Sequence, residues 1–352
     1  MWALANRSPF AAERGWVRDK DGAEVWVVAV MGTFEVGRDG LVSLAKDQEE
    51  VHVVPKYRGE PGQSSLLYES DLVHRKARTD VLLNGHAYAP RGEPTRSFMV
   101  GLKVSSVHKR LRVAGDRVYS PFGLVRSRPR PFTKMPLIYE RAYGGVDAFA
   151  RRAKKRAWEP RNPVGCGFAT RAWHRGGRPA PNMEDPRASF RNRPVGFGPI
   201  PGSWAPRVDH AGTYDEDWER TRQPLLAADF DERFYQSAPE DQQVDFLKGG
   251  ELIELVNLTP DGLLRFRLPR VSLGFETVFD GEENERHRCR LNTLILEPDL
   301  RRFMMVWHTH LPCHHKVLKL VTTKIQLKRR IHVSQSDRAD GVWAGVGEPR
   351  GA

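Results

Sequence analysis

Residues 24–36 read EVWVVAVMGTFEV, a run rich in β-branched and aromatic side chains. Such side chains suit a pleated, half-buried surface, so we expect one strand here, or two strands broken at Gly32. Residues 37–40 read GRDG, and their Asp-Gly pair favours a tight turn before the run LVSL at 41–44. We therefore predict a β-hairpin at this point in the chain.

Short strand-like runs lie further along the chain from this hairpin. Residues 97–104 and 107–113 are bounded by Pro, Gly or Ser, and in 107–113 the side chains of His108, Arg110 and Arg112 fall on one face opposite apolar ones. Similar patterns resume at 252–257, 263–268, 291–296, 302–307 and 317–327. We predict a mainly β protein with two sandwich-like antiparallel β units, over residues 1–125 and 251–335.

Residues 126–250 join the two units, and we expect an ordered, loop-rich segment with a few short helices. Gly, Pro and Arg break any periodicity here, yet large aromatic residues recur, which a disordered linker rarely carries. These aromatics are Trp158, Phe168, Trp173, Phe190, Phe197 and Trp204. Residues 213–216 fit a capping box, and a second helix is predicted between Pro239 and Gly249. Residues 336–352 are expected to be a flexible tail.

Composition narrows the class of protein. The chain has 352 residues, of which 39% are hydrophobic, so it can bury a core, and no apolar run is long enough to span a membrane. Its three cysteines, Cys166, Cys289 and Cys313, have no paired spacing, so neither disulfides nor a thiolate zinc site is expected. The first residues lack the features of a secretory signal, and we expect a cytoplasmic protein.

The net charge of +12 predicts a surface that attracts nucleic acid, acidic protein or anionic lipid. Basic residues cluster at 126–130, at 151–156 and at 328–330. No recognition helix, zinc finger or known arrangement of stacking aromatics accompanies them. We therefore expect solvated basic loops or contacts to an acidic protein rather than nucleic-acid binding.

The sequence lacks the common motifs of catalysis. It has no GxSxG elbow, no HExxH pair, no phosphate-binding loop ending in GK[ST] and no GxGxxG before a helix. The glycines at 165–167 and 196–198 lie among prolines, where they permit positive φ in tight loops. We expect no enzyme activity, no catalytic residue, no cofactor and no small-molecule substrate.

Residues 307–315 read WHTHLPCHH and form the strongest candidate for a metal site. In a strand, His308 and His310 would share one face, and two such imidazoles can begin a zinc or nickel site. No carboxylate or third ligand is identifiable nearby, so we expect an exposed strand end with solvated histidines and no metal. A metal-dependent hydrolase using His308, His310, His314 and His315 is kept as an alternative.

Several short motifs together carry a resemblance to a known family. They are NRSPF at 6–10, EPGQSSLLYESD at 60–71, YERAYGG at 139–145, NPVG at 162–165, PNMEDP at 181–186, GFGPI at 196–200, AGTYD at 211–215 and LTPDG at 258–262. Over about residues 1–330 the chain resembles the bacterial domain-of-unknown-function family encoded beside type VI secretion genes. Within the motifs, the residues expected to shape loops are Gly144, Gly145, Asn162, Pro163, Gly165, Gly196 and Gly198.

This resemblance implies an adaptor or chaperone that holds a toxic effector and loads it onto the PAAR-tipped VgrG spike. It implies effector, PAAR-like and VgrG proteins as partners, and no catalytic residues. Because interfaces favour arginine and aromatic side chains, we place the client surface in the middle segment. The candidates are Arg151, Arg152, Arg156, Trp158, Arg161, Phe168, Trp173 and Trp204. A nucleic-acid-associated basic protein is the main alternative, and export together with the spike is left open.

Overall fold

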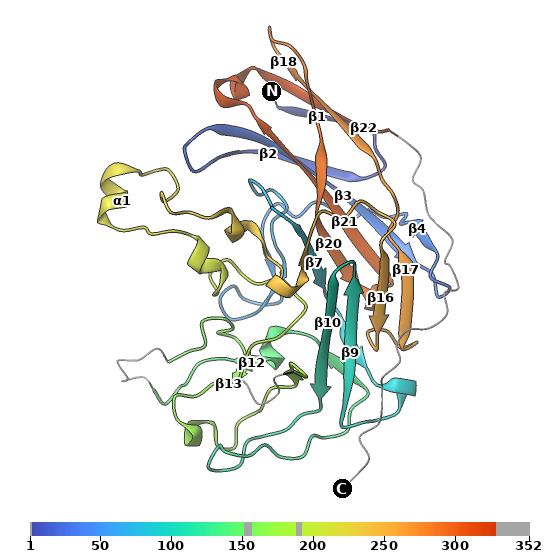
Figure 1. The fold of residues 1–352 in the computed structure, drawn as a ribbon, viewed down its shortest axis with the longest axis vertical. Helices are drawn as coiled ribbons and strands as arrows, with labels where there is room; N and C mark the ends of the chain where they lie inside the picture. Colours follow the sequence, from blue (N-terminus) through green and yellow to red (C-terminus); the bar gives the residue numbers. More distant parts are fainter. Residues whose placement is uncertain (1, 151–156, 188–191, 329–352) are drawn as a thin grey trace.

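The computed structural model describes residues 2–150, 157–187 and 192–328 of the chain. This part is mainly β, as predicted, and Figure 1 shows its strands gathered into sheets with long loops beside them. Among these residues, α1 (Glu216–Thr221) is the one α-helix. The 3₁₀ helices are η1 (Pro90–Gly92), η2 (Tyr139–Arg141), η3 (Ala172–Arg175), η4 (Arg207–His210), η5 (Glu232–Tyr235), η6 (Glu240–Gln242), η7 (Pro298–Leu300) and η8 (His314–Lys319).

The largest sheet has seven strands and contains the predicted hairpin. β3 (Glu24–Val36) runs unbroken through Gly32 and pairs antiparallel with β4 (Val42–Leu44), so the hairpin is confirmed. The remaining order of the sheet is β15 (Gln243–Val244), β7 (Thr79–Leu83), β20 (Cys289–Glu297), β21 (Arg302–Pro312), β3 and β2 (Ala11–Arg18).

The other sheets are smaller. The five-stranded sheet has the order β14 (Met183–Glu184), β10 (Val107–Ala114), β9 (Ser97–Val104), β16 (Leu252–Val256) and β17 (Leu263–Arg267). The four-stranded sheet has the order β1 (Ala3–Asn6), β22 (Leu320–Leu327), β18 (Leu273–Phe279) and β19 (Glu285–His287). Three strand pairs complete the described structure: β5 (Lys56–Tyr57) with β6 (Leu66–Tyr68), β8 (His86–Tyr88) with β11 (Lys134–Pro136), and β12 (Tyr143–Gly144) with β13 (Cys166–Gly167).

The sheets cross the boundaries expected at residues 125 and 251. β20 and β21 lie between β7 and β3, and β9 pairs with β16. Three of the described strand pairings, β7 with β20, β1 with β22 and β12 with β13, are parallel. The two antiparallel units expected over 1–125 and 251–335 are therefore interleaved, because alternation in a sequence fixes which face of a strand is buried and not which strand it joins.

One apolar core connects the three larger sheets. The ring of Phe303 on β21 stacks on Phe34 of β3 at 5.3 Å and on Phe266 of β17 at 5.1 Å between centroids. Trp26 is fully buried, and its indole N–H donates to Oγ1 of Thr323 on β22 at 2.9 Å. Buried rings of this size each contribute a large apolar area to the contacts between the sheets.

Both helix predictions need correction. The helix α1 begins after Asp215, whose carboxylate caps it by accepting from the backbone N–H of Trp218, while Thr213 bonds to Asp229 instead. The helix expected from Pro239 to Gly249 is only the single turn η6. After it the chain enters the sheet as β15, and the buried side chain of Gln242 donates to the carbonyl oxygens of Val81 and Phe197.

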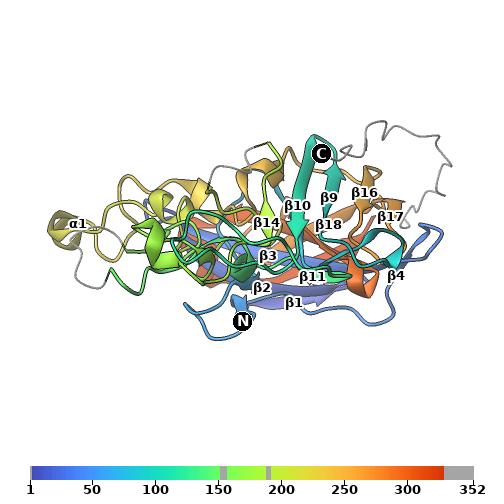
Figure 2. The same cartoon turned by 90° about the horizontal axis from the view of Figure 1, so that it is seen from below.

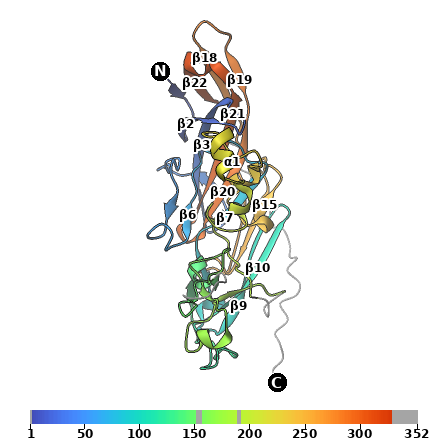
Figure 3. The ribbon, with the colours of Figure 1, turned by 90° about the vertical axis from the view of Figure 1, so that its left-hand side faces the viewer.

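The molecule is elongated. The four-stranded sheet lies at one end and loops of the middle segment, around β12 and β13, lie at the other (Figures 1 and 3). Figure 2 shows much of the irregular segment gathered to one side of the five-stranded sheet. The sheets therefore act as a scaffold that presents a loop-built end to solvent.

Candidate partner-binding surface

A buried carboxylate, that of Asp147, organises the loop-built end. Its Oδ2 accepts hydrogen bonds from the backbone N–H of Thr170 (2.8 Å), from the Thr170 hydroxyl (2.6 Å) and from Nδ1 of His174 (2.6 Å). Its Oδ1 accepts from the backbone N–H of Phe149 at 3.0 Å. Burial acts to raise the pKa of this carboxyl, but the hydrogen bonds from Thr170 and His174 outweigh it and hold the pKa well below its usual range. Asp147 thus ties residues 147–149 to residues 170–174.

Two large aromatic side chains are exposed to solvent next to this group of hydrogen bonds, which we call the Asp147 frame. Phe149 is 62% exposed and Trp173 is 57% exposed, with ring centroids 6.4 Å apart. The buried ring of His174 supports both, at 4.0 Å from Trp173 and 5.5 Å from Phe149. The guanidinium of Arg178 lies 4.9 Å from the Phe149 ring centre. These contacts fix the aromatic rings in position without burying them.

A second loop, residues 118–127, adds apolar side chains beside the first. Its tip exposes Phe122, Leu124 and Val125, with Phe122 at 75%. Between them, Gly123 has φ +71° and packs so closely that a Cβ would lie 1.7 Å from the carbonyl oxygen of Ala172. The Nε of Arg175 donates to the Gly123 carbonyl at 2.7 Å. The two loops therefore touch, and together they form what we call the exposed apolar surface: Phe122, Leu124, Val125, Phe149 and Trp173.

Several arginines lie in or next to the loops that carry this surface. The buried carboxylate of Glu184 accepts from both Arg117 and Arg126, and the guanidinium of Arg175 stacks 4.7 Å from the ring centre of Tyr119. The side chains of Arg128 and Arg171 are exposed near the same loops. Apolar side chains with arginines and other polar groups around them are a common composition of protein–protein interfaces.

The aromatic side chains expected to contact the partner differ in their exposure. Trp173 belongs to the exposed apolar surface, and Trp158 is exposed where residues Val146 and Trp158 form an antiparallel bridge. Phe168 is only half-buried, beside the ring of Tyr143. Trp204 is a correction: it is 4% exposed and packs edge-on against Tyr139 in the core, so it is unavailable to a partner.

The arginines expected to contact the partner also differ in their surroundings. Arg161 forms a bidentate ion pair with Glu159, with Nε donating to Oε1 at 2.6 Å and Nη2 donating to Oε2 at 2.9 Å. Arg151, Arg152 and Arg156 lie outside the described residues. Phe122, Leu124, Val125 and Phe149 were missed by sequence reasoning. The sequence does contain part of the evidence for them: residues 121–125 read PFGLV, which places three large apolar side chains around a glycine in a turn.

The loop motifs lie just behind this end. The amide nitrogen of buried Asn162 donates to the carbonyl oxygens of Tyr139 (2.8 Å) and Tyr143 (3.0 Å), next to Pro163. Gly144 and Gly145 have positive φ, and a Cβ on Gly145 would lie 2.3 Å from the carbonyl oxygen of Gly165. Elsewhere, Gly196 packs on the ring of Tyr139. At Gly198, by contrast, an added Cβ would meet its neighbours only at ordinary van der Waals distances. Close approach of backbone atoms explains the glycines at 144, 145 and 165, and the ring of Tyr139 explains the glycine at 196.

The histidines of residues 308–315 do not form one cluster. His308 is 5% exposed, His310 has its Nε2 3.2 Å from that of His74, and His314 and His315 are exposed on η8. Burial lowers the pKa of His308 to about 3 and that of His310 to about 4. The expectation of solvated histidines is therefore wrong for His308. Over residues 2–150, 157–187 and 192–328, no three or more His, Cys, Asp or Glu side chains are grouped to hold a metal ion.

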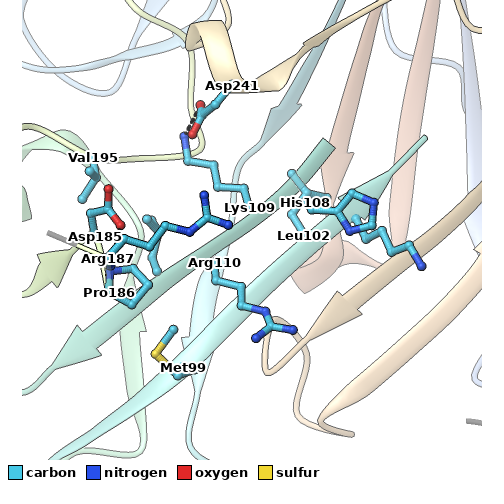
Figure 4. Close-up of a pocket in the computed structure, with 12 residues that line it drawn as sticks. Met99, Leu102, His108, Lys109, Arg110, Asp185, Pro186, Arg187, Val195 and Asp241 are labelled. Carbon is cyan, nitrogen blue, oxygen red and sulfur yellow. Dashed lines mark hydrogen bonds and ion pairs between the residues drawn. The ribbon is translucent and has the colours of Figure 1, made fainter. Parts of the chain in front are cut away.

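A separate groove runs beside β10 (Figure 4). Its main cavity has a volume of about 730 Å³ and is lined by residues of β9 and β10 and by Asp185, Pro186, Arg187, Val195 and Asp241. Within its wall, Nζ of buried Lys109 donates to Asp241 (2.8 Å) and to Oε1 of Gln242 (2.7 Å), and burial lowers the pKa of this lysine. We call this the β10 groove.

The described structure is that of a mainly β protein whose loops expose a group of large apolar side chains. The chain belongs to the family described as an uncharacterized protein conserved in bacteria (DUF2169), whose model matches residues 21–308. Membership of a bacterial domain-of-unknown-function family is thereby confirmed. No curated protein and no solved structure matches the chain. Among the described helices, none is long and apolar enough to cross a membrane.

Proposed function

We propose that this protein is a non-catalytic adaptor that binds a toxic effector and loads it onto the PAAR-tipped VgrG spike of type VI secretion. The observation that carries the proposal is the exposed apolar surface. Large apolar side chains gathered on one exposed surface mark sites of interaction with other molecules. Here the rings of Phe149 and Trp173 are held in place by Asp147 and His174 before any partner arrives. Holding side chains in their bound positions lowers the entropic cost of association.

The composition of this surface fits a partner that must be released. Aromatic and arginine side chains contribute most of the binding energy of protein interfaces, and a polar rim favours a complex that can dissociate. The exposed arginines near the loops also favour a client with acidic residues around an apolar patch. The burial of the thiols supports binding over nucleophilic chemistry, because it raises the pKa of Cys166 and Cys313 to about 11 and that of Cys289 to about 12.

The experiment compares two double variants of the tagged chain purified from its own bacterium. Phe149→Ser/Trp173→Ser removes the two rings, and Leu300→Ser/Leu318→Ser removes two exposed apolar side chains on η7 and η8, away from these loops. We expect wild type and the second variant to retain a toxin or spike protein, identified by mass spectrometry, and the first variant to lose it. Equal recovery with all three chains, or recovery of neither a toxin nor a spike protein with wild type, would contradict the proposal.

A further inference from the structure

The β10 groove continues into a second cavity. The main cavity of about 730 Å³ and a neighbouring one of about 310 Å³ share Lys109, Asp185, Val195 and Asp241 in their walls. The second cavity extends past Arg193, Pro194 and Ile200 towards Arg161. The two cavities are therefore adjacent, and together they form a depression with room for a stretch of extended chain.

The charges around this depression are unequal. Six Lys and Arg residues line the two cavities, against three Asp and Glu residues. Three of these cations have carboxylate partners within the protein: Lys109 with Asp241, Lys103 with Glu254 and Arg161 with Glu159. The side chains of Arg110, Arg187 and Arg193 are exposed at the rim. A ligand that enters the groove therefore meets a cationic rim over apolar side chains such as Met99, Leu111 and Val195.

The spacing of the cations along β10 adds a geometric preference. His108, Arg110 and Arg112 are exposed at every second residue and share one face of the strand, as Figure 4 shows for His108 and Arg110. Residues two apart on a strand repeat at roughly 6.8 Å, which is also the spacing of alternate side chains on an extended peptide. An extended segment with acidic side chains at alternate positions would match this row.

We propose that the β10 groove binds an extended acidic segment of a partner protein. This inference rests on the proposed function to the extent that an adaptor needs a second docking site, distinct from the exposed apolar surface. The groove fits single-stranded nucleic acid less well, because nucleic acid carries a negative charge at every nucleotide and would bring phosphates next to Asp185, Glu240 and Asp241, whereas the carboxylates of a peptide can be spaced to avoid them. Among the described residues of its lining, Tyr139 alone has a phenyl or indole ring. That ring is buried and its hydroxyl donates to the Gly198 carbonyl, so this part of the lining offers bases no stacking platform.

The test uses the full-length chain and a fluorescein-labelled peptide, GESELESEG, in an anisotropy titration. We expect saturable binding that weakens about tenfold or more between about 50 and about 300 mM NaCl, because salt screens the cationic rim. Arg110→Glu/Arg187→Glu should weaken binding about tenfold or more, and Arg110→Gln/Arg187→Gln by less, with unchanged melting temperature for the Gln variant. The matched control, Arg91→Glu/Arg286→Glu, alters two highly exposed arginines outside the groove and should bind within about twofold of wild type.

Three results would overturn this inference: no saturable peptide binding, an equal loss in the control variant, or tighter binding of a labelled oligonucleotide of equal charge. The last result would assign the groove to nucleic acid. Failure here can be told apart from failure of the adaptor function. Phe149→Ser/Trp173→Ser should bind the peptide like wild type, and Arg110→Gln/Arg187→Gln should still retain the effector.

Discussion

Oδ2 of Asp147 lies 2.6 Å from Nδ1 of His174, and this buried contact joins the two stretches of loop that carry Phe149 and Trp173. A carboxylate placed here can accept from all the N–H and O–H groups around it. An amide cannot, because one of its two polar atoms is a donor. The position of the exposed rings therefore depends on a charged group beneath them.

Asp147→Asn should lower the free energy of unfolding by about 2 kcal/mol, since at least one buried donor loses its acceptor. Chemical denaturation measures this directly. The control is Asp229→Asn, which alters an exposed carboxylate that accepts two bonds from Thr213 and should change stability much less. Equal losses in the two variants would mean that the Asp147 frame is not a buried network.

Trp204→Ala and Trp173→Ala should affect different properties. Trp204 lies in the core, so its truncation should cost about 3–5 kcal/mol of stability. Trp173 is exposed, so its truncation should change stability by about 0.5 kcal/mol or less while weakening client binding. Thermal melts and pull-downs on the same preparations distinguish these outcomes. A large loss of stability in Trp173→Ala would show that the ring belongs to the core.

Gly145→Ala should be more destabilising than Gly177→Ala. Both glycines have positive φ, so either substitution should cost about 1–2 kcal/mol of backbone strain. Only at Gly145 would the new Cβ also meet a backbone carbonyl, that of Gly165 at 2.3 Å, whereas Gly177 has open space. The clash should add about 1–3 kcal/mol, measured by denaturation. Equal costs would mean that the loop can relax around residue 145.

Acid should destabilise the protein before its carboxylates titrate. Burial lowers the pKa of His308 to about 3 and of His310 to about 4, from 6.5, and it also lowers the pKa of His74. Below pH 6.5 the unfolded chain therefore binds protons that the folded chain excludes, so stability is complete above this pH and falls as the pH decreases. Each buried histidine contributes a slope of up to about 1.4 kcal/mol per pH unit.

Denaturation at a series of pH values between about 6.5 and 5 checks this prediction. His310→Gln should flatten the decline, because glutamine does not take up a proton in this range. The exposed His314→Gln is the control and should leave the slope unchanged. A wild-type stability that is independent of pH across this interval would refute the burial of these imidazoles.

Much of the strand content could be predicted from the sequence, but the pairing could not. β3, β9 and β10 lie where β-branched runs and alternation place them. β18 was missed although it reads LGFETVF, with buried side chains at every second position. The interleaving of β20 and β21 with β3 and β7 depends on contacts across more than 200 residues, which no local pattern records.

The candidate site was predictable only in outline. The middle segment was recognised as an aromatic-rich loop region, but composition cannot tell a buried ring such as Trp204 from an exposed one such as Trp173. Trp204 is buried because it packs against Tyr139, whereas Trp173 is held at the surface by the Asp147 frame. His308 was misjudged for the same reason, because the burial of this imidazole depends on elements distant in sequence.

The most direct test of the adaptor function is reconstitution from three purified proteins: this chain, the effector recovered with it and the VgrG spike with its PAAR tip. Size-exclusion chromatography with light scattering reports which of them travel together. We expect the effector to co-elute with the spike only when the wild-type chain is present, and not with Phe149→Ser/Trp173→Ser. Equal co-elution of effector and spike in the absence of this chain would contradict the adaptor function.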